Sequence, residues 1–201
     1  MTPSETIEQA FLQLAFAVKL VTYAELGKFS RPEFDTDVLI KLERRNLPLR
    51  GGTFHSDDDI VLAAQNNFVL TLGFTVIVLD RALSEAGYAS NLDGASPNRD
   101  LRALIYMVRC AFAHDMMNPR WEARGPFARE LHVTLPSGVL LIDARALNEQ
   151  PFDISHVGGY EGYWEIKEEI ARMISKLNHA NGADSADLTL ARRGSLRTLG
   201  Q

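Results

Sequence analysis

The sequence predicts a mainly α-helical protein, an up-and-down helical bundle with a small β-hairpin inserted before the last helix. Two observations support this prediction: several long segments carry apolar residues at helical spacing, and beyond Pro119 the period changes to strict alternation. With 201 residues and 46% hydrophobic content, one main core is expected. We therefore expect residues 1–180 to form a single domain and residues 181–201, which contain few large apolar side chains, to form a disordered tail.

The N-terminal stretch contains two consecutive helix-start patterns. Thr2-Pro3-Ser4-Glu5 combines a capping residue, a first-turn proline and a glutamate three positions after the cap, so a helix is expected from there to Gly27. Ser30-Arg31-Pro32-Glu33 repeats the pattern and predicts a second, shorter helix that ends at Asn46-Leu47-Pro48.

A third, long helix is expected from residue 57 to near Gly87. The acids Asp57, Asp58 and Asp59 follow Ser56, as is typical of a helix N-terminus. Together with His55 they are also compatible with a metal site, but the cap is the favoured interpretation because no second group of ligands has a recognisable spacing. Residues 74–79 have the composition of a buried strand, yet the helical periodicity continues through them, so we predict helix despite Gly73.

The segment 98–120 carries the residues of greatest chemical interest. It is expected to be an amphipathic core helix that begins after a polar loop at 90–96 and is stopped by Asn118-Pro119. Arg102, Tyr106 and Arg109 occupy positions i, i+4 and i+7, which places them on one face beside the apolar one. Arg102 and Tyr106 are therefore candidates for a supporting role beside Arg109.

Residues 129–143 alternate between apolar and polar side chains around Pro136-Ser137-Gly138, which predicts a β-hairpin. A hairpin of this size is marginal alone and should pack against the helices. The last helix is expected over about residues 161–178.

Composition and missing motifs exclude several classes of function. A net charge of −5 argues against bulk coating of nucleic acid, and the single cysteine, Cys110, excludes an internal disulfide. The N-terminus lacks a signal-peptide pattern and the longest apolar run is too short to span a membrane, so we expect a cytoplasmic protein without a membrane segment. Phosphate-loop, dinucleotide-binding and metalloprotease motifs are absent, and we expect no cofactor and no metal.

Arg109 and His114 form the candidate site. An arginine can hold a phosphate through two parallel hydrogen bonds, and a histidine exchanges a proton near neutral pH, which together suit cleavage of a phosphodiester without metal. The spacing is a weak signal, because Arg50 and His55 repeat it within a glycine-containing loop. The position of Arg109 and His114 at the end of a core helix is what selects this pair.

A mostly helical domain with the motif R-x-x-x-x-H, here Arg109 to His114, at the end of a core helix resembles the HEPN superfamily. The resemblance implies an up-and-down helical bundle that dimerises, so that two Arg/His pairs share a cleft. It also implies metal-independent endoribonuclease activity of toxin or defence type, with a possible antitoxin or other protein partner. Arg109 would hold the scissile phosphate, and His114 would transfer a proton or position the ribose 2′-hydroxyl.

Alternatives remain open for these residues. Arg109 is also compatible with a surface cation, and His114 with a helix-end residue that interacts with the helix dipole. Asp115 would either orient His114 or only end the helix, and Trp121 and Tyr106 would either stack on bases or close the core. The alternative function is a non-catalytic HEPN-like interaction or nucleotide-binding module, which Cys110 favours because the residue after the motif arginine is usually polar in that family.

Overall fold

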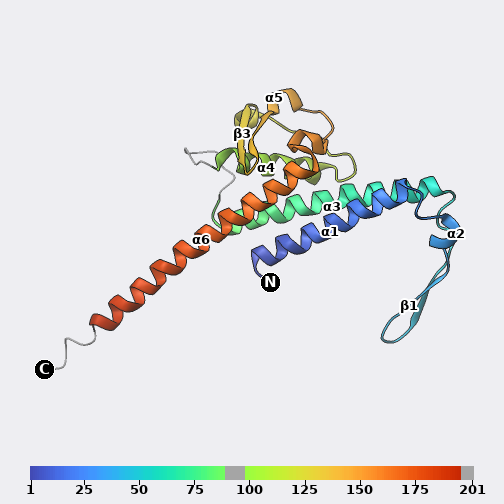
Figure 1. Ribbon diagram of the computed structural model, residues 1–201, viewed down its shortest axis with the longest axis horizontal. Helices are drawn as coiled ribbons and strands as arrows, with labels where there is room; N and C mark the ends of the chain where they lie inside the picture. Colours follow the sequence, from blue (N-terminus) through green and yellow to red (C-terminus); the bar gives the residue numbers. More distant parts are fainter. Residues whose placement is uncertain (89–97, 196–201) are drawn as a thin grey trace.

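The computed structural model describes the backbone of residues 1–88 and 98–195 and the side chains as far as residue 177, and it confirms the mainly helical class (Figure 1). The α-helices are α1 (Pro3–Glu25), α2 (Arg31–Phe34), α3 (Asp57–Glu85), α4 (Arg99–His114), α5 (Ala144–Leu147) and α6 (Gly159–Ser195). The strands are β1 (Val38–Lys41), β2 (Asn46–Leu49), β3 (Glu130–Leu135) and β4 (Gly138–Asp143), and short 3-10 turns cover Gly125–Phe127 and Ile154–Val157.

Helices α1 and α3 lie side by side and run in opposite directions (Figure 1). Both start with a capping box, at Thr2 and at Ser56, as their sequences predict. Near the end of α1 and the start of α3, Gln65 donates a hydrogen bond of 3.1 Å to Glu25. The acids after Ser56 therefore belong to a helix N-terminus, where Asp59 accepts from the backbone N–H groups of His55 and Ser56.

Helix α4 lies in the core, between α3 and the hairpin formed by β3 and β4. Its buried side chains are Leu101, Arg102, Ala103, Leu104, Ile105, Met107, Val108, Ala111 and Phe112. The strands β3 and β4 pair antiparallel within the stretch where alternation predicts a hairpin, and β3 buries Leu131, Val133 and Leu135. The contacts of α4 with both neighbours leave only one edge of the helix open to solvent.

Helix α3 is continuous through residues 74–79, so the helical interpretation of that run is confirmed. The helix is long and apolar enough to pass a composition test for a membrane span. Its contacts with α1, α4 and α6 nevertheless make it a core helix, and Leu72, Val76, Leu79 and Leu83 are buried in those contacts.

The predicted second helix is wrong beyond its first turn. Helix α2 ends at Phe34, and the rest of the segment forms the antiparallel hairpin of β1 and β2. Two carboxylates explain the early end of the helix: Asp35 accepts a hydrogen bond from the N–H of Phe54, and Asp37 accepts one from the N–H of Gly51. These bonds join the two ends of the segment that contains β1 and β2, and they replace the backbone hydrogen bonds that a longer helix would form.

Two helix ends also differ from the sequence prediction. Helix α4 stops at His114, before Asn118-Pro119, because the Asp115 carboxylate accepts hydrogen bonds from the N–H groups of Met117 and Asn118 and thereby forms a turn. Helix α6 continues to Ser195, through most of the stretch expected to be a disordered tail. Residues 196–201 of that tail, and the polar loop expected at 90–96, lie outside the described residues.

Gly73 permits the close approach of α3 and α4. A Cβ atom at this position would lie 2.6 Å from Cδ1 of Phe112 and 2.8 Å from Sδ of Met116. Replacement of Gly73 by alanine should therefore destabilise the protein by about 1 to 2 kcal/mol, because overpacking outweighs the gain of about 1 kcal/mol in helix propensity. Urea unfolding measures this difference.

The matched control for Gly73→Ala is Ala63→Gly, at an exposed position of the same helix. This exchange measures only the difference in helix propensity between alanine and glycine, and it should destabilise the protein by about 1 kcal/mol. Increased stability of Gly73→Ala would contradict the role assigned to this glycine.

Candidate functional site

The open edge of α4 carries Arg109. Its side chain is 43% exposed, and its Nε atom lies 3.9 Å from Oδ2 of Asp80 on α3. That distance is at the limit of an ion pair and leaves the guanidinium group free to form further hydrogen bonds. Arg109 is thus a solvent-accessible cation with a carboxylate beside it.

Asp80 is held in place by Arg102, a second arginine of α4 that is buried in the core. Nη1 of Arg102 donates to Oδ1 of Asp80 at 2.6 Å, while Nη2 and Nε donate to the Ser84 hydroxyl and the Tyr88 carbonyl. With a side chain only 5% exposed, Arg102 cannot reach a ligand in solvent. The supporting role expected for Arg102 is therefore restricted to positioning Asp80 opposite Arg109.

Tyr106 and Cys110 lie on the same side of α4 as Arg109. The Tyr106 ring stacks on Phe127 with a centroid distance of 5.1 Å. Its hydroxyl group interacts with the Cys110 side chain, and this hydrogen bond, reinforced by burial, raises the pKa of Tyr106 above its ordinary value. Tyr106 is therefore a neutral hydrogen-bonding group near Arg109, and one of its ring faces is occupied by Phe127.

His114 is the last residue of α4 and has a side chain that is 67% exposed. Its Nε2 atom lies 3.4 Å from Oε2 of Glu122, in the segment that follows α4. Asp115, the neighbour expected to orient the imidazole, instead bonds the backbone of the following turn. Glu122 thus supplies the carboxylate beside His114 that was expected from Asp115. No motif in the sequence indicates this role for Glu122.

Arg109 and His114 point in different directions along the same helix. Because α4 is helical as far as His114, five residues of an ideal helix separate the two side chains by about 140° and by a rise of about 7.5 Å. Their side chains therefore do not converge on one atom within a single chain.

Trp121 and His132 lie elsewhere and have structural partners. Trp121 is completely buried, in ring contact with Phe152, and its indole N–H donates to Nδ1 of His156 at 3.0 Å. His132 lies 2.7 Å from Glu130 on the neighbouring hairpin. Within the described residues there is no group of three His, Cys, Asp or Glu side chains that could hold a metal ion.

Comparison of the chain with known proteins finds no matching family model, no matching curated protein and no matching solved structure.

The two arginines of α4 should respond very differently to truncation. Arg102→Ala leaves Asp80 without its main partner and should destabilise the protein by about 3 kcal/mol. Arg109→Ala removes an exposed cation and should change stability by less than about 1 kcal/mol. Urea denaturation followed by circular dichroism measures both, and equal losses would contradict the division between a structural and an accessible arginine.

Proposed function

We propose that this chain is an HEPN-like, metal-independent endoribonuclease of toxin or defence type that acts as a cytoplasmic homodimer. The proposed architecture is an up-and-down bundle of α1, α3, α4 and α6, with the dimer contact at the exposed edge of α4. The antiparallel arrangement of α1 and α3 supports the bundle. An antitoxin or other neutralising protein partner belongs to the same proposal.

One observation carries the proposal: Arg109 and His114 are both accessible, and each has a carboxylate at ion-pair distance. Asp80 is already bound by Arg102, so an incoming phosphate can replace it as the partner of Arg109. After this exchange Asp80 keeps its ion pair with Arg102, so its negative charge still has a partner. Arg109 is thereby suited to hold a phosphate and to stabilise the negative charge that develops on it.

Glu122 gives His114 a defined chemical role. The Glu122 carboxylate can accept a hydrogen bond from an N–H on Nε2, and in that tautomer Nδ1 is the nitrogen that accepts a proton. In the proposed reaction the ribose 2′-oxygen attacks phosphorus while its proton moves to His114. The bond from phosphorus to the 5′-oxygen breaks, that oxygen takes up a proton from water, and a 2′,3′-cyclic phosphate remains on the other fragment. DNA lacks the 2′-hydroxyl and would not be cleaved.

The second copy completes the proposed site. The angle of about 140° between Arg109 and His114 prevents both from contacting one phosphate within a chain. A twofold axis near the edge of α4 would place His114 of one copy opposite Arg109 of the other, and would form two equivalent sites.

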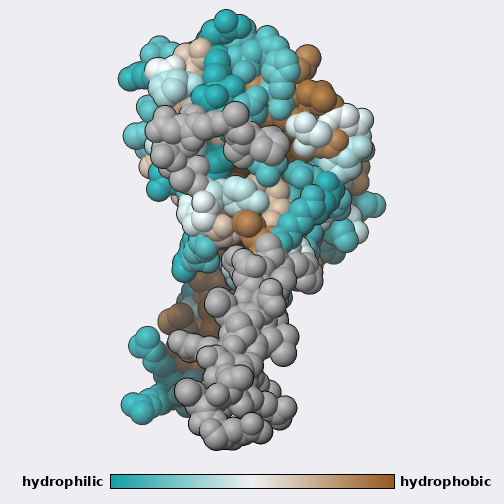
Figure 2. Space-filling view, turned by 90° about the vertical axis from the view of Figure 1, so that its left-hand side faces the viewer, coloured by the Kyte–Doolittle hydropathy of each residue, from teal (hydrophilic) through white to brown (hydrophobic). Residues whose placement is uncertain are grey.

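A second candidate function is a non-catalytic HEPN-like interaction or nucleotide-binding module. It is favoured by large apolar side chains that are exposed on α1 and α3: Leu12, Phe16, Tyr23, Leu62, Leu70 and Phe74. Figure 2 shows a largely hydrophilic face with separate hydrophobic patches. Surfaces of this kind are typical of protein contacts.

The test of the proposed function is RNA cleavage by purified variants in the presence of EDTA. Arg109→Ala and His114→Ala should each lower the cleavage rate by at least about a hundredfold, the usual effect of removing a proton-transfer or phosphate-binding group. Both variants should stay folded, because both side chains are exposed and make only ion-pair contacts.

The chain offers matched controls for both positions. Arg81→Ala removes an exposed arginine of α3 that is paired with Glu85, and His132→Ala removes an exposed histidine paired with Glu130. Neither change should affect cleavage. Full cleavage by Arg109→Ala and His114→Ala, or a wild-type protein that binds a nucleotide or protein but leaves diverse RNAs intact, would overturn the enzymatic proposal.

A further inference from the structure

The hairpin of β1 and β2 projects from the helical body as an arm, which we define as residues 38–49 (Figure 1). Every residue of the two strands is exposed, although most are apolar. The large apolar side chains of the arm are Val38, Leu39, Ile40, Leu42, Leu47 and Leu49. Exposure of apolar residues on both faces of a two-stranded sheet is unfavourable for a monomer and indicates a binding partner.

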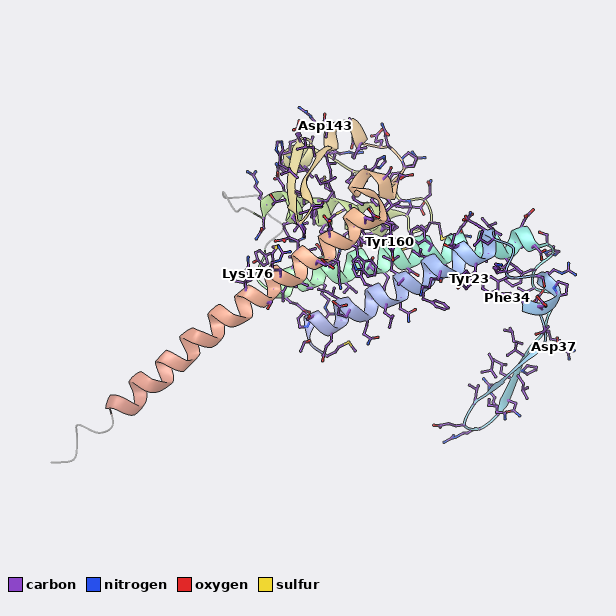
Figure 3. All side chains as sticks on the ribbon, in the orientation of Figure 1. Tyr23, Phe34, Asp37, Asp143, Tyr160 and Lys176 are labelled. Carbon is purple, nitrogen blue, oxygen red and sulfur yellow. The ribbon has the colours of Figure 1, made fainter. Side chains whose placement is uncertain are left out.

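The root of the arm is firmly attached to the body. A row of aromatic rings runs from Tyr23 through Phe29 and Phe34 to Phe54, with centroid distances of 5.5 to 6.3 Å. At the neck, a Cβ atom at Gly51 would collide with the carbonyl oxygen of Asp35. Figure 3 shows Tyr23, Phe34 and Asp37 following one another from α1 toward the arm. The arm is thus an ordered element held away from the core.

The pattern of hydrogen bonds determines which edge of the arm can accept another strand. The N–H of Leu42 donates to the carbonyl of Arg45, so these two residues form a hydrogen-bonded pair. From this pair toward the root of the arm, non-hydrogen-bonded and hydrogen-bonded pairs alternate. Leu39 and Pro48 form a non-bonded pair, in which backbone groups point outward. Proline has no N–H, so the outer edge of β2 is blocked, whereas the outer edge of β1 presents the N–H and carbonyl groups of Leu39 and Lys41.

We propose that β1 pairs antiparallel with β1 of a second copy of this chain, with Leu39 opposite Leu39. This register satisfies the outward-pointing backbone groups, because residues 37, 39 and 41 of one copy face residues 41, 39 and 37 of the other. It also places Asp37, the residue before β1, opposite Lys41 of the second copy, twice across the twofold axis. One oxygen of the Asp37 carboxylate accepts from the N–H of Gly51, and the other is the one that would pair with Lys41. Between these charge pairs, Val38 faces Ile40 of the second copy.

Residues 37–41, which are β1 and the residue before it, are therefore complementary to themselves in charge and in their aliphatic pair. Opposite charges and aliphatic pairs across antiparallel strands are stabilising, whereas like charges placed opposite each other are not. A shift by two residues would set Asp37 opposite Leu39 and Lys41 opposite Asp35. The Asp35 carboxylate already accepts a hydrogen bond from the N–H of Phe54 beside the helical body. Self-complementarity is what favours a second copy over an unrelated strand.

Pairing also resolves the instability of the isolated arm. Two hairpins joined through β1 form a four-stranded sheet in the order β2, β1, β1, β2, and sheets of three or more strands are far more stable than a single hairpin. One face of this sheet would collect five apolar side chains from each copy. By the register of the hairpin these are Val38, Ile40, Leu42, Leu47 and Leu49.

The proposal goes beyond the proposed function and does not rest on it. The arm lies beyond the end of α1 and away from α4, so arm pairing is independent of whether the chain cleaves RNA (Figure 1). It constitutes a self-association surface separate from the edge of α4.

The first test is the substitution Leu39→Pro, which copies onto β1 the block that Pro48 places on β2. It removes two hydrogen bonds between the copies but none within the hairpin, because Leu39 is in a non-bonded pair. Sedimentation equilibrium should show that self-association weakens about tenfold or more. Leu39→Thr, which keeps the N–H, should associate like the wild type. Identical association of wild type and Leu39→Pro, or a wild type that is monomeric at all concentrations, would overturn the proposal.

The second test establishes the register without a disruptive change. In a background with Cys110→Ala, Leu39→Cys should be cross-linked into a covalent dimer by a short bifunctional maleimide, because residue 39 faces itself across the twofold axis. Leu47→Cys is the control on β2, with a similarly exposed side chain of 44% against 54% for Leu39. Strands about 4.8 Å apart would separate the two copies of residue 47 by about 14 Å, beyond the reach of the reagent. Equal cross-linking of both variants would contradict β1 pairing.

Discussion

The ion pair between Asp80 and Arg102 links the fold of this protein to its candidate site. It joins α3 to α4 through a contact of 2.6 Å that is almost entirely shielded from solvent. A buried arginine is tolerated only when its donors are satisfied, and Ser84 and Tyr88 complete the set. The second oxygen of Asp80 faces Arg109, so the contact that fixes the two helices also fixes the electrostatic surroundings of the exposed cation.

The packing of α4 fixes how its two candidate residues are arranged. Helix α4 is held on one side by the close approach at Gly73 and on the other by β3. In a helix held by these contacts, Arg109 and His114 lie about 140° apart around the axis. Under the proposed function the second copy is required by this geometry, and the arm would provide a further contact between copies. A chain that used both twofold contacts would assemble beyond a dimer.

The sequence predicts the long helices because their signals are local. Capping boxes at Thr2 and Ser56 and an unbroken apolar period define α1 and α3 without reference to the rest of the fold. The arm was missed because Val38, Leu39 and Leu42 also fit a short helical pattern. The turn at Glu43-Arg44 lacks the glycine or asparagine typical of a hairpin. Pro48 and the β-branched residues Val38 and Ile40 were the available signals for strands.

The candidate site was predictable only in part. Arg109 and His114 follow from a motif, and both are accessible in the structure. Their carboxylate partners are not predictable, because Asp80 lies on another helix and Glu122 reaches His114 only through the path of the chain after Pro119. The structural role of Arg102 likewise depends on its burial, which its position on the face beside the apolar one did not indicate.

Mixing two inactive variants tests the shared site most directly. If Arg109 of one copy works with His114 of the other, then Arg109→Ala mixed and re-equilibrated with His114→Ala forms heterodimers that contain one intact site. With random assortment, half of the dimers are mixed and half of their sites are complete, so the account predicts recovery of about a quarter of wild-type RNA cleavage. Cleavage by the wild type with no recovery in the mixture would contradict a site built from two copies.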